Sequence, residues 1–233
     1  MGFKKAGGEV IKGILVIVLN FKAYAESGGE HALLLARIAR ESASLWNKPV
    51  FVCPSLLDTQ RVCHELPQFD KFRVLAQHCD SNAEGAFTGS IPAEAVRKAG
   101  AYGTLLNHSE KKLKQLEEYV IAAKKAGLYV IVCASTAKEC GRAAKMKPDA
   151  VAFEPPDLIG SGVSVTTRPE AAKKCISAIR KTKGVLALVG AGVSNAEDVA
   201  TAKKLGADGV LLASAYVKAH DHKTFLNKLL EAD

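Results

Sequence analysis

The chain has 233 residues, of which 48% are hydrophobic and 24% charged, and its formal net charge is +8. This length allows one barrel-sized domain or two smaller ones, and the composition is that of an ordinary globular protein. The longest apolar run, residues 14–19, is too short to cross a bilayer, which excludes a membrane-spanning protein.

The positive charge raises the question of an anionic partner. Basic pairs such as Lys111-Lys112 and Lys203-Lys204 fall in helix-like segments mixed with apolar positions, and aromatic residues make up only 6% of the chain. No basic run alternates with aromatic residues, so solvated helix faces are favoured over a nucleic-acid site. A small phosphorylated ligand is the simpler anionic partner. We expect neither nucleic acid nor membrane as a partner.

The start of the chain and the cysteines indicate the cellular compartment of the protein. Residues 1–13 contain charges but no apolar stretch of signal-peptide length, and Ala6 replaces the Ser or Thr of a myristoylation signal. We interpret residues 1–13 as an N-terminal extension and a candidate for disorder. The six cysteines form no CxxC pair, which favours free thiols in a reduced cytoplasmic protein.

Short runs rich in Val, Ile and Leu alternate along the chain with longer segments of helical character. The runs are continuous rather than alternating, as expected for parallel strands covered on both faces. They lie at residues 14–20, 49–54, 71–77, 102–107, 128–135, 149–155, 184–190 and 208–214. About eight such units without a linker predict an α/β fold with a single (β/α)8 barrel over residues 14–233. Two doubly wound half-domains are the competing architecture.

Barrel chemistry takes place at the carboxyl ends of the strands, so the residues after each run are the candidates. Asn20 ends the first run and Lys22 follows it. A lysine at the end of a buried strand is costly unless it meets an anion, which makes Lys22 a candidate for substrate binding. The alternative is a lysine that extends its ammonium group to solvent at the barrel rim.

His108 follows the fourth run, within the sequence Asn107-His108-Ser109-Glu110. Ser109 is a good N-cap residue and Glu110 suits a first helical turn, so we expect a helix to begin here. The positive helix end would disfavour a charged imidazole, leaving His108 neutral and able to donate a hydrogen bond. Alternatively, His108 only satisfies a nearby backbone carbonyl.

Glu154 lies at the end of the sixth run, and a semi-buried carboxylate at this position suits a general base. The stiff Pro155-Pro156 pair and the glycines at 160 and 162 indicate a rigid lid with flexible ends. An ordinary loop behind a structural glutamate is the alternative.

Small residues follow the last two runs. Gly190 ends the seventh run and Gly192 follows it, and Ala213 and Ser214 end the eighth. Small side chains let backbone amides approach a ligand, and the loops after strands 7 and 8 are the usual phosphate site of a barrel. This pattern supports phosphate binding but does not choose among barrel enzymes.

Other polar clusters are weaker candidates. Residues 77–80, Gln-His-Cys-Asp, look like metal ligands, but neighbours in an extended segment point to opposite faces, so a polar rim or a subunit contact is favoured. Residues 220–222, His-Asp-His, fit a surface helix turn. We expect no metal and no cofactor.

Taken in order, these motifs resemble those of the triosephosphate isomerase family, over residues 16–230. The matching stretches are NFK (20–22), NHSEKK (107–112), FEPPDLIGSG (153–162), GAGVSNAEDV (190–199) and GVLLASA (209–215). The EPP form of the lid and AQHCD (76–80) look like the archaeal-type branch.

The resemblance implies a role for each matching residue. It implies that His108 is the electrophile, that Glu154 is the base and that Lys22 and Asn20 contact the substrate. Further substrate contacts would come from Ile159 and Gly160 in the lid, and from Gly192, Ala213 and Ser214 through backbone amides to phosphate.

The resemblance also implies an activity and an assembly. The activity is the interconversion of dihydroxyacetone phosphate and glyceraldehyde 3-phosphate, in glycolysis and gluconeogenesis, and the assembly is a homotetramer rather than a dimer. Two rival hypotheses remain from the residues alone: a barrel enzyme acting on larger sugar phosphates, and a phosphate-binding barrel without catalysis.

Overall fold

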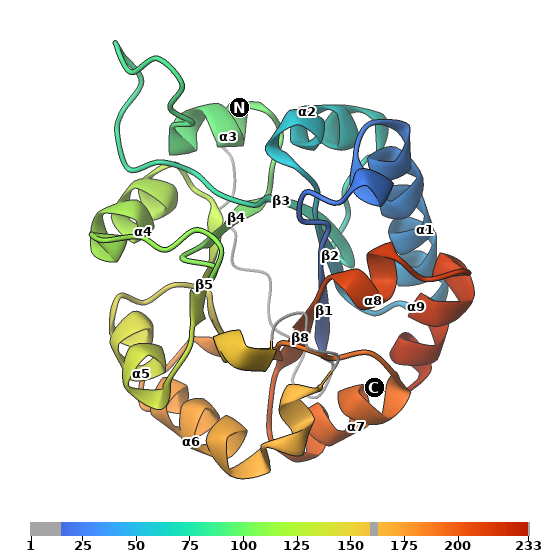
Figure 1. Ribbon diagram of the computed structural model, residues 1–233. Helices are drawn as coiled ribbons and strands as arrows, with labels where there is room; N and C mark the ends of the chain where they lie inside the picture. The colour runs from blue at the N-terminus through green and yellow to red at the C-terminus, as the bar shows by residue number, and fades with distance from the viewer. Residues whose placement is uncertain (1–14, 159–162, 233) are drawn as a thin grey trace.

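Eight parallel strands form one closed barrel in the computed structural model, which describes residues 15–158 and 163–232 (Figure 1). Each strand pairs with the next along the chain, and the eighth pairs with the first. The strands are β1 (Val16–Asn20), β2 (Val50–Cys53), β3 (Phe72–Ala76), β4 (Gly103–Leu106), β5 (Tyr129–Ala134), β6 (Ala150–Phe153), β7 (Leu186–Gly190) and β8 (Gly209–Leu212). This confirms the predicted barrel and the eight predicted runs, each of which is trimmed at its ends.

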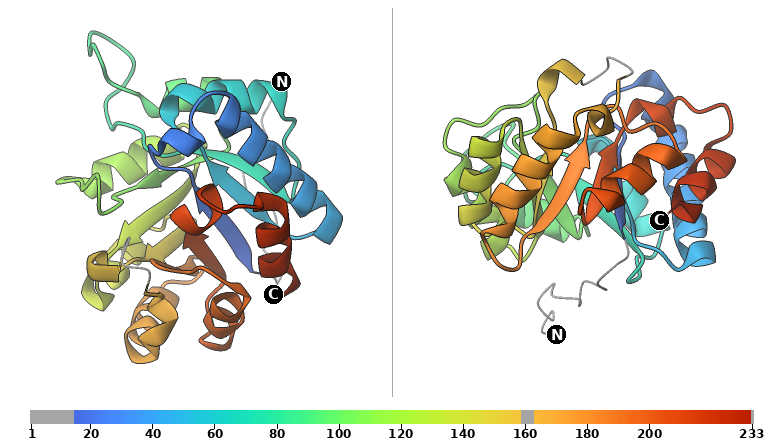
Figure 2. Two further views of the ribbon diagram at one scale, coloured as in Figure 1. Left: turned by 45° about the vertical axis from the view of Figure 1, so that its right-hand side comes forward. Right: turned by 90° about the horizontal axis from the view of Figure 1, so that it is seen from below.

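Helices surround the barrel in every view (Figures 1 and 2). The α-helices are α1 (Glu30–Trp46), α2 (Leu56–Glu65), α3 (Ala93–Lys98), α4 (Leu116–Lys125), α5 (Ala137–Lys145), α6 (Pro169–Arg180), α7 (Ala196–Lys204), α8 (Ser214–Val217) and α9 (His222–Glu231). Short 3-10 helices are η1 (Ala25–Ser27), η2 (Pro156–Leu158) and η3 (Val165–Thr167). Within the described ranges, no helix has both the length and the apolarity needed to span a membrane.

Side-chain caps fix where several outer helices begin. The side chains of Ser55, Thr136, Asn195 and Asp221 each accept a hydrogen bond from a backbone N–H in the first turn of α2, α5, α7 and α9, respectively. Each cap satisfies one of the amides that a helix start leaves without a partner. These bonds therefore fix the residue at which each of the four helices begins.

The strands are buried on both faces, which explains their continuous apolar sequences. In β1, Ile17 and Leu19 belong to the core between strands and helices, whereas Val16 and Val18 point into the barrel. The barrel interior is filled by apolar side chains from all eight strands. No face of these strands needs the polar residues that an exposed sheet face would carry.

Aromatic rings fill the barrel toward the amino ends of the strands. Tyr102 precedes β4 and stacks on Tyr129 at the start of β5, with ring centroids 5.4 Å apart. Phe51 of β2 meets both rings edge-on. Because this end of the barrel is filled with side chains, a ligand has room only toward the carboxyl ends.

The expectation that a helix begins at Ser109 is wrong. Residues 108–115 form turns, and α4 starts at Leu116 with Gln115 as its N-cap. The physical reason is that Asn107 bonds across these turns: its Nδ2 donates to the Cys133 carbonyl and its Oδ1 accepts from the Leu113 amide. These bonds hold the chain out of helical geometry until Leu116.

Two other expectations concern residues that the structure does not describe. The predicted extension, residues 1–13, lies wholly outside the described ranges, and so do Ile159 and Gly160 of the predicted lid. The lid's first residues are described and form η2, which directly follows Glu154 and Pro155.

Gly103 tests how tightly the strands are paired. A Cβ built at Gly103 would lie 2.2 Å from the backbone oxygen of Tyr129, the residue beside it in the β4–β5 pairing. We expect Gly103→Ala to lower the free energy of unfolding by about 1–3 kcal/mol, because neighbouring backbone must move. Urea denaturation at fixed protein concentration measures this change.

Gly141, inside α5, is the matched control because a Cβ there would approach no atom closer than 3.7 Å. Gly141→Ala should raise the free energy of unfolding by about 0.5–1 kcal/mol, since alanine favours a helix interior over glycine. Equal effects of the two substitutions would contradict the steric explanation for Gly103.

Candidate active site

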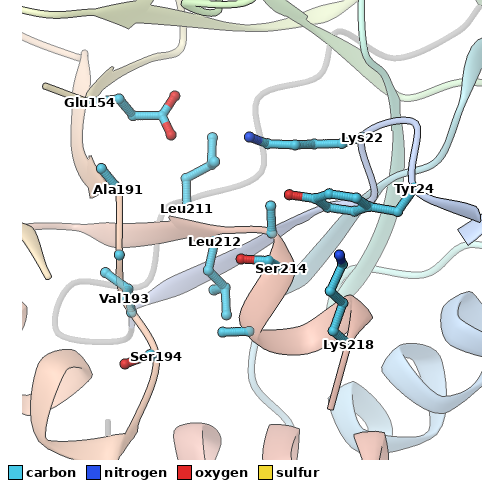
Figure 3. A pocket seen from close by; sticks show the side chains of 13 residues that line it. Lys22, Tyr24, Glu154, Ala191, Val193, Ser194, Leu211, Leu212, Ser214 and Lys218 are labelled. Atoms are coloured by element: carbon cyan, nitrogen blue, oxygen red, sulfur yellow. The ribbon is translucent and has the colours of Figure 1, made fainter. Parts of the chain in front are cut away.

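A pocket of about 370 Å³ opens at the carboxyl ends of β1, β6, β7 and β8 (Figure 3). Its lining residues come from the end of β8, from α8 and from the segments that follow the four strands. They are Lys22, Tyr24, Glu154, Ala191, Gly192, Val193, Ser194, Leu211, Leu212, Ala213, Ser214, Ala215 and Lys218. Five predicted site residues therefore meet in one place: Lys22, Glu154, Gly192, Ala213 and Ser214.

The turn after β1 aims Lys22 at the pocket. Lys22 has a φ of 51°, in the left-handed region that a side chain with a Cβ rarely adopts. Asn20, buried at the end of β1, holds this turn by accepting the Lys22 backbone N–H on Oδ1 at 3.0 Å. Asn20 thus shapes the turn from below, whereas Lys22 lines the pocket.

Gln77 is a residue of this turn that the sequence interpretation missed. It follows β3, and its Nε2 donates to the backbone oxygens of Lys22, at 2.9 Å, and Cys53, at 3.0 Å. The same nitrogen lies 3.3 Å from Asn20 Oδ1. One amide therefore ties together the ends of β1, β2 and β3 beneath the site, so Gln77 is a positioning residue rather than a polar rim.

The Lys22 side chain ends in an ion pair. Its Nζ lies 2.7 Å from Oε1 of Glu110, which belongs to the turn after β4. The Lys22 side chain is only 12% exposed, so the pair is screened less than one in open solvent. Its ammonium group therefore does not simply extend into solvent.

The turn after β4 fixes the protonation pattern of His108. The backbone N–H of Glu110 donates to His108 Nδ1 at 3.2 Å, and the His108 carbonyl accepts from Lys111. Because Nδ1 accepts, the proton of a neutral ring sits on Nε2. The Glu110 amide therefore selects the tautomer of the neutral ring, in the place where a helix end was expected.

His108 and Glu154 face each other at the mouth of the barrel. His108 Nε2 lies 3.7 Å from Glu154 Oε2, although the two residues follow different strands. Both residues are buried, and within the described part of the chain neither of these two atoms has a hydrogen-bond partner. Buried polar atoms without partners are unfavourable for folding, so a pair of them at the barrel mouth indicates a site that binds a polar ligand.

The Glu154 side chain has room because the neighbouring residue 190 is a glycine. A Cβ at Gly190 would lie 2.8 Å from Glu154 Cγ and 2.9 Å from its Oε1. Two buried thiols lie below the carboxylate: burial, and then the charge of Glu154, raise the pKa of both Cys53 and Cys133. These thiols are protonated, so they are not nucleophiles at neutral pH.

Gly192 closes the β7 side of the pocket. Its φ is +70°, and a Cβ there would lie 1.9 Å from the backbone oxygen of Val163. Ala191 also has a positive φ, and its carbonyl accepts from the Val165 amide at 3.0 Å. The chain beyond the lid is thus held against this loop, and only glycine fits at the point of contact.

The remaining polar clusters do not contribute to the pocket. His78 Nε2 bonds Asp80 Oδ1 at 2.9 Å, and burial lowers the pKa of His78. Asp221 caps α9, and His222 Nδ1 contacts the Tyr216 carbonyl. Among the residues that the structure describes, no group of three or more His, Cys, Asp or Glu side chains is arranged to hold a metal ion.

Comparison with known proteins relates the chain to one family. The family model described as "Triosephosphate isomerase" matches residues 15–231. Curated relatives with that name include those of Methanobacterium bryantii (42% identity, 94% of this chain and 97% of the relative), Archaeoglobus fulgidus (41%, 92% and 96%) and Methanopyrus kandleri (42%, 92% and 96%).

A solved structure supports the fold. The crystal structure of triosephosphate isomerase from Bartonella henselae matches with a TM-score of 0.73 and 19% identity, covering 94% of this chain and 99% of that one. At 19% identity this match confirms the barrel fold but assigns no role to any residue.

The hydrogen bond from the Glu110 amide predicts a specific state of the His108 ring. We expect nitrogen NMR of protein labelled in histidine to show that the neutral form of His108 has Nδ1 unprotonated and Nε2 protonated. His108→Gln, by removing one signal set, assigns the resonance among the six histidines. A neutral ring with its proton on Nδ1 would contradict the assignment.

Proposed function

The chain belongs to the triosephosphate isomerase family and is an isomerase that interconverts dihydroxyacetone phosphate and D-glyceraldehyde 3-phosphate, and we propose that Glu154, His108 and Lys22 carry out the reaction through an enediolate. Family membership disfavours the two rival hypotheses, an enzyme for larger sugar phosphates and a barrel without catalysis. The observation that carries the residue assignment is the 3.7 Å separation of two buried, unpartnered atoms, His108 Nε2 and Glu154 Oε2.

Glu154 acts as the base in this proposal. Its carboxylate removes a proton from the carbon next to the substrate carbonyl and returns it to the neighbouring carbon. Burial of Glu154 and the room left by Gly190 support this role, because a carboxylate that is poorly solvated and free to reach carbon is an effective base. The same group gives back the proton, so no external acid is required.

His108 acts as the electrophile. Its Nε2–H donates to the substrate carbonyl oxygen and stabilises the negative charge that develops as carbon loses its proton. It can then help to move the hydroxyl proton between the two oxygens of the enediolate. The Glu110 amide supports this role because it leaves the proton of a neutral ring on Nε2, the nitrogen that faces Glu154.

Lys22 adds a positive charge beside the developing oxyanion, and Asn20 holds the turn that presents it. We assign the substrate phosphate to the loops after β7 and β8, with backbone amides of Gly192, Ala213 and Ser214 as donors. Ile159 and Gly160 are assigned to a lid that excludes water, because an enediolate in water can lose its phosphate. This acid–base chemistry requires no metal or organic cofactor.

We further propose that the enzyme assembles as a homotetramer of the archaeal type and works in the cytoplasm, in glycolysis and gluconeogenesis. Six free thiols suit a reducing compartment. Large apolar side chains are exposed on α1, α2 and α4 and in the loop that projects between β3 and α3 (Figure 1). They include Leu45, Leu57, Ile121 and Phe87, and such side chains suit subunit contacts.

Substitution of the three proposed catalytic residues tests the mechanism in a coupled assay with glyceraldehyde 3-phosphate. Glu154→Gln, His108→Gln and Lys22→Met should each lower kcat by about 10²–10³ or more, since each removes a group that acts in the transition state. Glu117→Gln, an exposed acid on α4, is the control and should keep full activity. A fully active Glu154→Gln enzyme would eliminate Glu154 as the base.

The assembly is tested by light scattering on the purified protein. A tetramer gives a mass four times the 24.7 kDa of the chain. A mass twice that of the chain would leave a dimer and reject the proposed tetramer.

A further inference from the structure

The pocket contains a second lysine that the catalytic proposal does not use. Lys218 lines the pocket on the side of β8, and the Tyr24 ring separates it from Lys22 (Figure 3). It follows α8 directly, and its backbone N–H donates to the Ser214 carbonyl at 2.9 Å. Residues four apart on a helical turn share a face, so the Lys218 side chain stands on the same side as Ser214.

Tyr24 holds the Lys218 side chain in this position. The Lys218 ammonium lies 4.6 Å from the centre of the Tyr24 ring, a cation–π contact, and both residues line the pocket. Tyr24 comes two residues after Lys22, on the turn after β1. The ring therefore stands between the two ammonium groups, as Figure 3 shows, and connects the two sides of the pocket.

The local charges show why a second cation matters. Lys22 pairs with Glu110 at 2.7 Å, and Glu154 adds a negative charge on the same side of the pocket. The three formal charges, one positive and two negative, give no net positive charge that would attract a dianionic phosphate from a distance. Lys218 pairs with Glu26 at 3.9 Å, and Glu26 is 53% exposed, so solvent weakens that pair. Lys218 thus supplies the positive charge that this end of the pocket otherwise lacks.

We propose that Lys218, held by Tyr24, binds and attracts the phosphoryl group of the substrate. The proposal rests on the isomerase function proposed above and extends it to a residue outside the catalytic set. A half-exposed ammonium group at this position contacts the phosphate in the ground state and in the transition state alike. Its removal should therefore raise KM rather than lower kcat.

Lys218→Gln is the test, and it should lower kcat/KM about tenfold at low ionic strength, mostly through KM. Added salt should shrink the difference from the wild type, because screening removes the electrostatic attraction. Lys218→Arg should restore most of the loss. Tyr24→Leu should show part of the KM effect, whereas Tyr24→Phe, which keeps the ring, should not.

Lys223→Gln is the matched control. Lys223 lies on α9, is 58% exposed, pairs with Glu41 at 4.0 Å and does not line the pocket. Like Lys218→Gln, the Lys223→Gln substitution removes one positive charge. If the Lys218 and Lys223 variants lose kcat/KM equally, or neither loses any, Lys218 has no specific role and the proposal is wrong.

Inorganic phosphate separates this proposal from the assignment of the reaction. Phosphate should raise the melting temperature of the wild type and of Lys223→Gln, and raise that of Lys218→Gln much less, without any turnover. If phosphate binding depends on Lys218 but the wild type does not interconvert the trioses, the phosphate site stands and the reaction assignment fails. If the wild type is active and phosphate binds both variants equally, the Lys218 proposal alone fails.

Discussion

The parallel pairing of β8 with β1 closes the barrel, and the whole site depends on this closure. It brings Lys22, near the start of the described chain, and Ser214, near its end, to the border of one pocket. The register of β4, β5 and β6 likewise brings His108 and Glu154 within 3.7 Å of each other. A slip of one residue in any of these pairings would turn the affected side chains to the opposite face of the sheet. The site therefore forms only if the entire barrel does.

Three of the five described non-glycine residues with positive φ lie at the pocket end of the barrel. Lys22, Asn107 and Ala191 have φ values of 51°, 60° and 68°, and each closely follows a strand at the pocket end. A left-handed conformation at a residue other than glycine costs on the order of 1–3 kcal/mol. Hydrogen bonds from Gln77, from the Asn107 side chain and to the Ala191 carbonyl hold these conformations. Part of the stability of the barrel is thus used to keep its catalytic end in a shape that the local sequence disfavours.

The barrel could be predicted because parallel strands covered on both faces leave continuous apolar runs, and the polar residue after each run marks the pocket end. This reasoning located His108 and Glu154 together. It failed at Ser109, because the mostly polar sequence from 109 to 115 suits a loop as well as the start of a helix. The hydrogen bonds of the Asn107 side chain favour the loop. It also missed Gln77 and Lys218, whose roles arise from contacts with strand ends far away in the sequence.

The net charge of +8 is a poor guide to what the pocket presents to a ligand. Many outer basic groups form exposed ion pairs, such as Arg61 with Glu30, and at physiological salt their influence fades over about 8 Å. Inside the pocket the order of charges matters more than their sum: the carboxylates of Glu110 and Glu154 lie near His108, whereas the Lys218 ammonium lies at the Tyr24 ring. A triose phosphate carries its charge at one end only. Under the proposed mechanism, this arrangement admits the substrate in one direction, with its phosphoryl group away from the base and its carbonyl beside the imidazole.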